Sequence, residues 1–196
     1  MNLGVVSGVS TVSSSHAEPD SKAEEAINPM TSGANEEPVH ARDIAQYLLD
    51  KFGPVSPMKL QKLLYYCQAW SLAWDGVPLF DDPIEAWANG PVVRDVWERT
   101  RDRGPLVDYP IGNGKITLNA NSPSTIASVM AHYRKQSGRV LSDLTHVEDP
   151  WVQTRIAANA LDGQPSNAVI TNESMRRYYS ELEQAAQAQQ ARAQRA

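Results

Sequence analysis

The chain has 196 residues with a formal net charge of −5, and 41% of its residues are hydrophobic, a size and composition that suit one domain with tails. Six acidic residues and one lysine lie in residues 1–38, which leaves the remaining residues with no net charge. Contacts to phosphates supply most of the affinity of nucleic-acid-binding proteins, so such proteins usually carry a basic surface. A neutral body with an acidic arm lacks this charge distribution.

Cysteine usage and hydropathy favour a protein of a reducing cytoplasm. Cys67 is the single cysteine, so no internal disulfide can form, and its place between aromatic residues predicts a small buried side chain rather than a reactive thiol. No apolar run is long enough to span a membrane. The N-terminus also lacks the basic and apolar regions of a signal peptide.

Residues 1–38 are rich in Ser, Gly, Glu and Asn and show no sustained hydrophobic period. Such a segment buries too little apolar surface to offset the entropy of ordering it. We therefore predict a disordered acidic arm, within which Met30 is an alternative to Met1 as the start of translation.

Two helices are predicted next. The first covers residues 41–52 and ends at Gly53-Pro54. The second begins at Pro57, with Ser56 as its cap, and ends at Gly76. Its apolar residues recur at steps of three and four over a broad stripe, which predicts the central helix of the domain.

The middle of the chain is less regular. Residues 84–87 are predicted to form a short extended segment or a turn, and Asn89-Gly90-Pro91 is predicted to open a third helix. Residues 109–119 contain Gly112-Asn113-Gly114 between β-branched residues, which predicts a small β hairpin.

Further helices are predicted from similar cap and proline signals at their N-termini. Ser122-Pro123 opens a fourth helix, residues 140–144 suggest a short one, and Asp149-Pro150 opens another. Thr171 or Asn172 caps the last helix, which continues into an Ala-, Gln- and Arg-rich tail at residues 181–196 without an apolar face. The expected fold is a mainly α, compact multi-helix domain at residues 41–180 with a small β hairpin, a disordered N-terminal arm and a helical, frayed tail.

No pattern of catalytic or metal-binding residues is apparent. No two of the four histidines have helical metal-site spacing, and we interpret His146, beside Glu148 and Asp149, as a structural hydrogen-bonding residue. Nucleophile motifs and phosphate-binding loops are absent from the sequence. We therefore expect no catalytic residue, no metal and no cofactor.

Lys59 and Lys62 allow two interpretations. Most lysines at such spacing are solubilising surface residues. Here they stand beside Gln61, Tyr65 and Tyr66, and a charged surface with aromatic residues is typical of protein-binding sites. A helix-turn-helix is a weaker alternative, because Leu, Tyr and Trp fill the helix that would enter the major groove.

Three sequence blocks together resemble the Panacea domain family, which includes the SocA-like antitoxins. The first is residues 59–73, the second combines residues 78–80 and 84–87 with Gly90-Pro91-Val92-Val93, and the third joins residues 141–146 to Pro150-Trp151. The resemblance covers about residues 41–180. It implies an antitoxin that neutralises a cognate protein toxin, a translation or growth inhibitor, by direct protein–protein binding, encoded in a phage or prophage and acting in phage defence.

The resemblance also implies which residues to test. Candidate toxin-binding positions are Lys59, Gln61, Lys62, Tyr65, Tyr66 and Glu85. Positions with an expected structural role are Trp70, Trp87, Gly90, Pro91, His146, Pro150 and Trp151.

Alternative functions stay open at this point. Some relatives act as adaptors that deliver a toxin to a cytoplasmic protease, and a DNA-binding regulator is a further alternative. The expected partners are a protein toxin and, for the adaptor, a protease, with no membrane and no nucleic acid. The acidic arm is expected to fold onto a basic toxin surface. The sequence does not set the oligomeric state.

Overall fold

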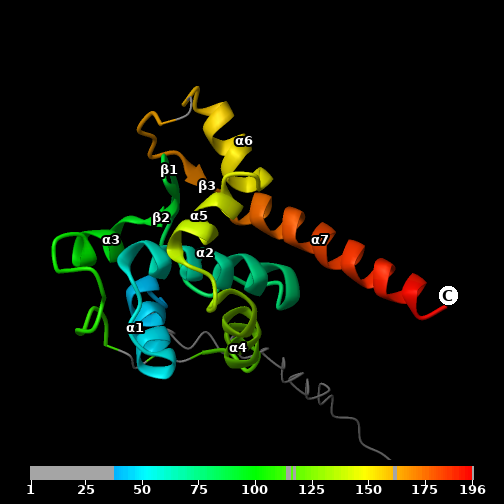
Figure 1. The fold of residues 1–196 in the computed structure, drawn as a ribbon, viewed down its shortest axis with the longest axis horizontal. Coiled ribbons are helices and arrows are strands. Elements are labelled where there is room, and N and C mark those ends of the chain that lie inside the picture. Colours follow the sequence, from blue (N-terminus) through cyan, green and yellow to red (C-terminus); the bar gives the residue numbers. More distant parts are fainter. Residues whose placement is uncertain (1–37, 114–115, 117, 161–162, 196) are drawn as a thin grey trace, which may run out of the picture. The chain divides into compact units, whose positions relative to one another are not determined.

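The computed structural model describes residues 38–113, 116, 118–160 and 163–195, which belong to one compact unit, Glu37–Ala196. The predicted disordered arm lies outside the described residues except for residue 38. The mainly α fold with a small β element is confirmed (Figure 1). The helices are α1 (Ala41–Phe52), α2 (Pro57–Trp74), α3 (Arg94–Thr100), α4 (Ser122–Tyr133), α5 (Gly138–Thr145), α6 (Asp149–Ala157) and α7 (Asn172–Ala193), and the strands are β1 (Ile84–Trp87), β2 (Gly90–Val93) and β3 (Val169–Ile170).

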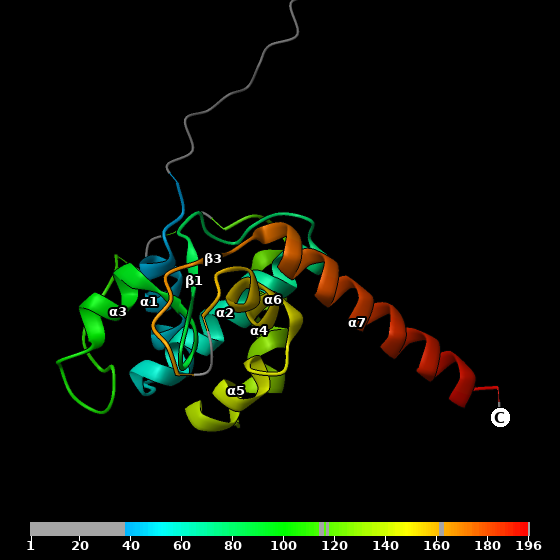
Figure 2. The ribbon, with the colours of Figure 1, turned by 90° about the horizontal axis from the view of Figure 1, so that it is seen from above.

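Helix α2 is the centre of the domain, as its broad apolar stripe predicted. Ser56 caps it by accepting a hydrogen bond from the Lys59 backbone N–H at 3.3 Å, and Pro57 occupies the first turn. Twelve of its eighteen residues are buried, because α4, α5, α7 and β2 all contact it. Both views show α2 enclosed by these elements (Figures 1 and 2).

The β hairpin lies at residues 84–93. Strand β1 pairs antiparallel with β2, from Ile84 opposite Val93 to Trp87 opposite Gly90, and β3 pairs with the other side of β1. The prediction that Asn89-Gly90-Pro91 opens a helix is therefore wrong, since α3 begins at Arg94. Gly90 closes a tight turn at φ 94°, and Pro91 is tolerated because β2 is an edge strand.

The hairpin predicted at residues 109–119 is wrong for the part of that stretch that the structure describes, which contains no strand. Gln46 Oε1 accepts a hydrogen bond from the Ile111 N–H at 2.9 Å, and Asp43 Oδ1 accepts one from the Asn113 N–H at 2.7 Å. A Cβ at Gly112 would lie 2.3 Å from the Arg42 carbonyl oxygen. Glycine is needed here for close packing of a loop on α1 rather than for a hairpin turn.

Helix α7 continues well past the packed part of the domain. Met175 and Tyr179 are its buried residues, and from Glu181 onward it is mostly exposed. Its second half projects away from the other helices (Figures 1 and 2). The helical part of the predicted tail is thus confirmed to Ala193. Within the described residues, no helix combines the length and hydropathy that crossing a membrane requires.

Candidate protein-binding site

Two consecutive polar residues of α2 hold strand β2 in place. Gln61 accepts a hydrogen bond from the Val93 N–H at 2.8 Å and donates one to the Val93 carbonyl at 3.3 Å. Lys62 Nζ donates to the Pro91 carbonyl at 3.0 Å. All three side chain–backbone bonds are buried, where an unpaired backbone group would be costly. These α2 side chains therefore fix the position of the hairpin.

Gln68 has the same role one heptad further along α2, and sequence reasoning missed it. Its Oε1 accepts hydrogen bonds from the N–H groups of Leu79 at 2.8 Å and Phe80 at 3.1 Å, and its Nε2 donates to the Phe80 carbonyl at 3.0 Å. The spacing of seven residues from Gln61 was a usable signal, because it places both amides on one face of a buried helix.

Lys62 is not a solubilising surface residue. Its side chain is fully buried, and burial lowers the pKa of its amine to about 7. A Cβ at Gly90 would lie 2.7 Å from both the Lys62 Nζ and the Thr145 hydroxyl. The backbone of β2 thus approaches the amine as closely as a glycine allows. Lys59 lies one turn earlier on α2, is partly buried, and donates a hydrogen bond to the Arg134 carbonyl at 2.7 Å.

Tyr65 and Tyr66 lie in the core, on the flank of α2 that meets α7. Glu148 accepts hydrogen bonds from the Tyr66 hydroxyl at 3.1 Å and the Tyr179 hydroxyl at 2.7 Å. Burial raises the pKa of the Glu148 carboxyl to about 7, although these hydrogen bonds act in the opposite direction. The Tyr66 ring stacks on Tyr133 with ring centroids 3.9 Å apart. The two sequence-predicted tyrosines therefore organise the interior.

Glu85 joins β1 to the start of α3. Its carboxylate accepts two hydrogen bonds from the Arg94 guanidinium, at 3.0 and 2.6 Å, and one from the Trp87 indole N–H at 2.7 Å. The Arg94 guanidinium also lies over the Trp87 ring, 5.3 Å from its centroid. The Trp87 and Trp97 rings meet edge to face at 4.8 Å. Glu85 thus holds one wall of an aromatic cluster.

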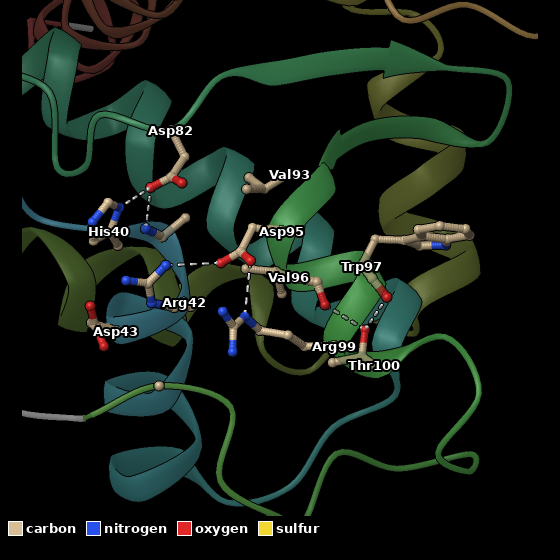
Figure 3. A network of polar contacts seen from close by, with 12 residues as sticks. His40, Arg42, Asp43, Asp82, Val93, Asp95, Val96, Trp97, Arg99 and Thr100 are labelled. Atoms are coloured by element: carbon tan, nitrogen blue, oxygen red, sulfur yellow. Dashed lines mark hydrogen bonds and ion pairs between the residues drawn. The ribbon is translucent and has the colours of Figure 1, made fainter.

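A polar network on the other side of α3 sets the direction of Trp97. Asp95 pairs with Arg42 of α1 at 3.4 Å and with Arg99 at 3.0 Å. Figure 3 shows this network between α1 and α3, with Trp97 pointing away from it. Anchoring α3 through Asp95 leaves Trp97 free to form the wall of a pocket on the opposite side.

That pocket has a volume of about 880 Å³ and lies between the start of α2, the hairpin turn, α3 and residues 163–167. It is large enough for a small ligand or an inserted protein segment. Its lining includes Met58, Gln61, Lys62, Trp87, Arg94 and Trp97. Four residues of the sequence blocks, Gln61, Lys62, Trp87 and Val92, thus meet at one concave surface.

The other predicted residues lie elsewhere. Trp70 donates from its indole to the Tyr133 hydroxyl at 3.2 Å, on the α4 and α7 side. The His146 ring stacks on Trp151 at 4.3 Å, and the Trp151 indole donates to the Trp87 carbonyl at 2.9 Å. Sequence reasoning missed the remaining walls of the pocket. Met58, Arg94, Trp97 and Arg101 line it from positions with no distinguishing local pattern.

Among the described residues there is no metal-ligating cluster and no activated thiol. No group of three or more His, Cys, Asp or Glu side chains within them is arranged to hold a metal ion. Burial raises the pKa of the Cys67 thiol to about 12, which keeps it protonated and poorly nucleophilic. What the pocket offers is aromatic surface, guanidinium groups and one buried amine.

Comparison with known proteins gives the same family as the sequence blocks. Residues 60–152 match the model of the family described as antitoxin SocA-like, Panacea domain. A stretch of 71 residues is 41% identical to Antitoxin SocA of Caulobacter vibrioides (strain NA1000 / CB15N), which covers 34% of this chain and 38% of that protein. No solved structure matches the chain. The predicted resemblance to the Panacea domain family is therefore confirmed for residues 60–152, which extend from α2 into α6.

Proposed function

We propose that this protein is an antitoxin that neutralises a cognate protein toxin by binding it directly in the cytoplasm. The observation that carries the proposal is the match of residues 60–152 to the antitoxin SocA-like family. The related stretch of the Caulobacter antitoxin covers little more than a third of that protein, so the toxin and its activity are open to experiment.

The architecture supports binding by a preformed surface. Gln61, Lys62 and Glu85 fix the hairpin and α3 through buried or partly buried hydrogen bonds, so the pocket walls are held before a partner arrives. A surface that is already ordered loses little conformational entropy on association. Of the predicted toxin-binding residues, Gln61 and Lys62 line this surface directly, and Glu85 supports it through Arg94 and Trp87.

The test is co-expression with the product of the neighbouring gene. We expect that product to arrest growth when expressed alone, and we expect this protein to restore growth and to co-purify with it. Continued arrest in cells that contain the folded protein at higher levels than the toxin would contradict the proposal.

A second candidate function is that of an adaptor that delivers the toxin to a protease. The exposed second half of α7 favours it, because this segment projects from the domain and is accessible to a second partner (Figure 1). Toxin half-life separates the two functions. An antitoxin that acts by binding alone leaves the toxin at full abundance, whereas an adaptor shortens its half-life in a protease-dependent way.

A further inference from the structure

We infer that the pocket beside α3 receives a segment of the toxin that carries a carboxylate next to a large apolar side chain. This inference rests on the proposed antitoxin function and adds the place of contact and the chemistry of the partner.

The apolar part of the pocket fits a large side chain. Met58 stands at the rim with 42% of its surface exposed, and the edge-to-face indoles of Trp87 and Trp97 form a wall. Aromatic pairs and methionine of this kind are enriched in protein interfaces and dominate their energetics. A volume of about 880 Å³ accommodates more than one side chain.

The charged part of the pocket fits an anion. Three lining residues are basic, Lys62, Arg94 and Arg101, and one is acidic, Asp102, while Glu85 pairs with Arg94 from outside the lining. The Asp102 carboxylate pairs with Arg101 at 2.9 Å and is 80% exposed, so solvent screens it strongly. The Arg101 guanidinium lies over the Trp97 ring at 4.8 Å, which places a cation directly beside the apolar wall.

Lys62 strengthens this preference from the floor of the pocket. Its amine is buried, and burial disfavours its charged form. An incoming carboxylate stabilises the ammonium that water no longer solvates. A cationic partner would meet the opposite situation, because it would add a like charge beside the Lys62 amine and the Arg101 guanidinium.

A protein segment fits these features better than nucleic acid does. Outside residues 1–37 the chain has 17 basic and 17 acidic residues, so the body provides no extended positive surface for a phosphate backbone. The basic residues of the pocket are instead interleaved with apolar surface inside one concavity, which is the arrangement that anchors individual side chains of a protein partner.

Two charge variants test the inference without disturbing the fold. Met58→Glu places an acid in the first turn of α2, where the helix dipole favours it, and Arg101→Glu changes an exposed side chain at the end of α3. The matched controls are Leu182→Glu and Arg177→Glu on α7, both at exposed positions. We expect each pocket variant to raise the Kd for the purified toxin about tenfold or more, because it sets like charges against each other, and we expect each control to leave the Kd unchanged.

The full-length chain is used throughout, with circular dichroism and Tm to verify folding. If both pocket variants keep the wild-type Kd and Tm while wild-type protein still neutralises the toxin, the inference is overturned and the antitoxin function stands. If the wild-type protein neither binds nor neutralises the toxin, the proposed function itself fails.

A photo-crosslinking residue at Asn89, an exposed position of the hairpin turn that lines the pocket, provides an independent test. We expect it to capture a toxin peptide that contains Asp, Glu or the C-terminal carboxylate beside a large apolar residue. The same residue at Arg177 is the control. Capture of a toxin peptide without an acid, capture of nucleic acid, or equal capture at both positions would each overturn the inference.

Discussion

Helix α2 uses two kinds of buried polar contact on two of its flanks. On the flank that meets β2, its side chains form hydrogen bonds with backbone groups. On the flank that meets α7, two tyrosine hydroxyls donate hydrogen bonds to one carboxyl group. Gln61 and Lys62 provide the first kind of contact, and Tyr66, Tyr179 and Glu148 provide the second. The first arrangement shapes a pocket that opens to solvent, and the second closes the interior. One helix thus uses its polar residues to position a surface on one side and to join helices on the other.

The difference has a consequence for stability because the two flanks bury ionisable groups of opposite type. Burial raises the pKa of an acid and lowers that of a base. Both Glu148 and Lys62 are shifted to a pKa of about 7, from 4.5 and 10.5 respectively. The contributions of the two flanks to folding therefore change with pH in opposite directions.

The largest expected effect is that of Gln61→Ala. The substitution leaves the buried N–H and carbonyl of Val93 without their side-chain partner, which we expect to lower the free energy of unfolding by roughly 3–5 kcal/mol. Urea denaturation at pH 7 measures it. The matched control is Gln184→Ala on the exposed part of α7, where we expect a change within about 0.5 kcal/mol. Equal effects at the two positions would show that Gln61 does not hold β2.

Glu148→Gln tests the flank that meets α7. Between pH 4.5 and 7 the folded chain binds a proton at Glu148 that the unfolded chain has released, so the contribution of Glu148 to stability is lost as pH rises through 7. We expect this group to lower the free energy of unfolding by about 3 kcal/mol across that range. Denaturation at pH 5, 6 and 7 measures the slope. The neutral amide of the variant resembles the protonated carboxyl, so we expect a stability close to that of the wild type at pH 5 and a flatter dependence on pH, and an unchanged slope would contradict the assignment.

Lys62→Met tests the flank that meets β2, where the change of stability with pH is expected to have the opposite sign. Between pH 7 and 10.5 the unfolded chain binds a proton that the buried amine does not hold, so stability rises with pH. From pH 7 to 9 we expect a gain of about 2.5 kcal/mol from this group, which the variant lacks. Lys59→Met, at a partly buried position of the same helix, is the control and keeps most of the gain. If the free energy of unfolding of the Lys62→Met variant still rises by the same amount from pH 7 to 9, the rise comes from another group.

The sequence predicted the elements whose boundaries are set locally. Ser56-Pro57 opens α2 and Gly53-Pro54 follows α1 because caps and proline geometry act within one turn. The two errors both concern glycines whose role is long-range. Gly90 is held against Lys62, and Gly112 against the carbonyl of Arg42, so their surroundings come from residues at least 28 positions away. No local pattern distinguishes a glycine in a hairpin turn from one that is required because another segment packs closely against its backbone.

The candidate site was predictable only in part for the same reason. The sequence blocks that resemble the family include Gln61, Lys62 and Trp87, which line the pocket. The burial of Lys62 was not predictable, since a lysine is rarely buried and the carbonyl of Pro91 that receives its hydrogen bond is 29 residues away. Trp97 and Arg101 reach the pocket through the placement of α3, which packs through Val96 and Thr100 and contacts Arg42 of α1 through Asp95.

The smallest expected effect on stability is that of shortening α7, which tests whether its exposed end contributes to the folded domain. Deletion of residues 187–196 keeps Tyr179 and the hydrogen bond from Trp74 to Glu183, so we expect the free energy of unfolding to change by less than about 0.5 kcal/mol. Deletion of residues 178–196 is the contrasting variant, because it removes the Tyr179 hydroxyl from Glu148 and should lower the Tm clearly. The shorter deletion also separates the two candidate functions. Neutralisation by binding alone persists without residues 187–196, whereas a loss of toxin turnover in that variant would assign the exposed part of α7 to a protease.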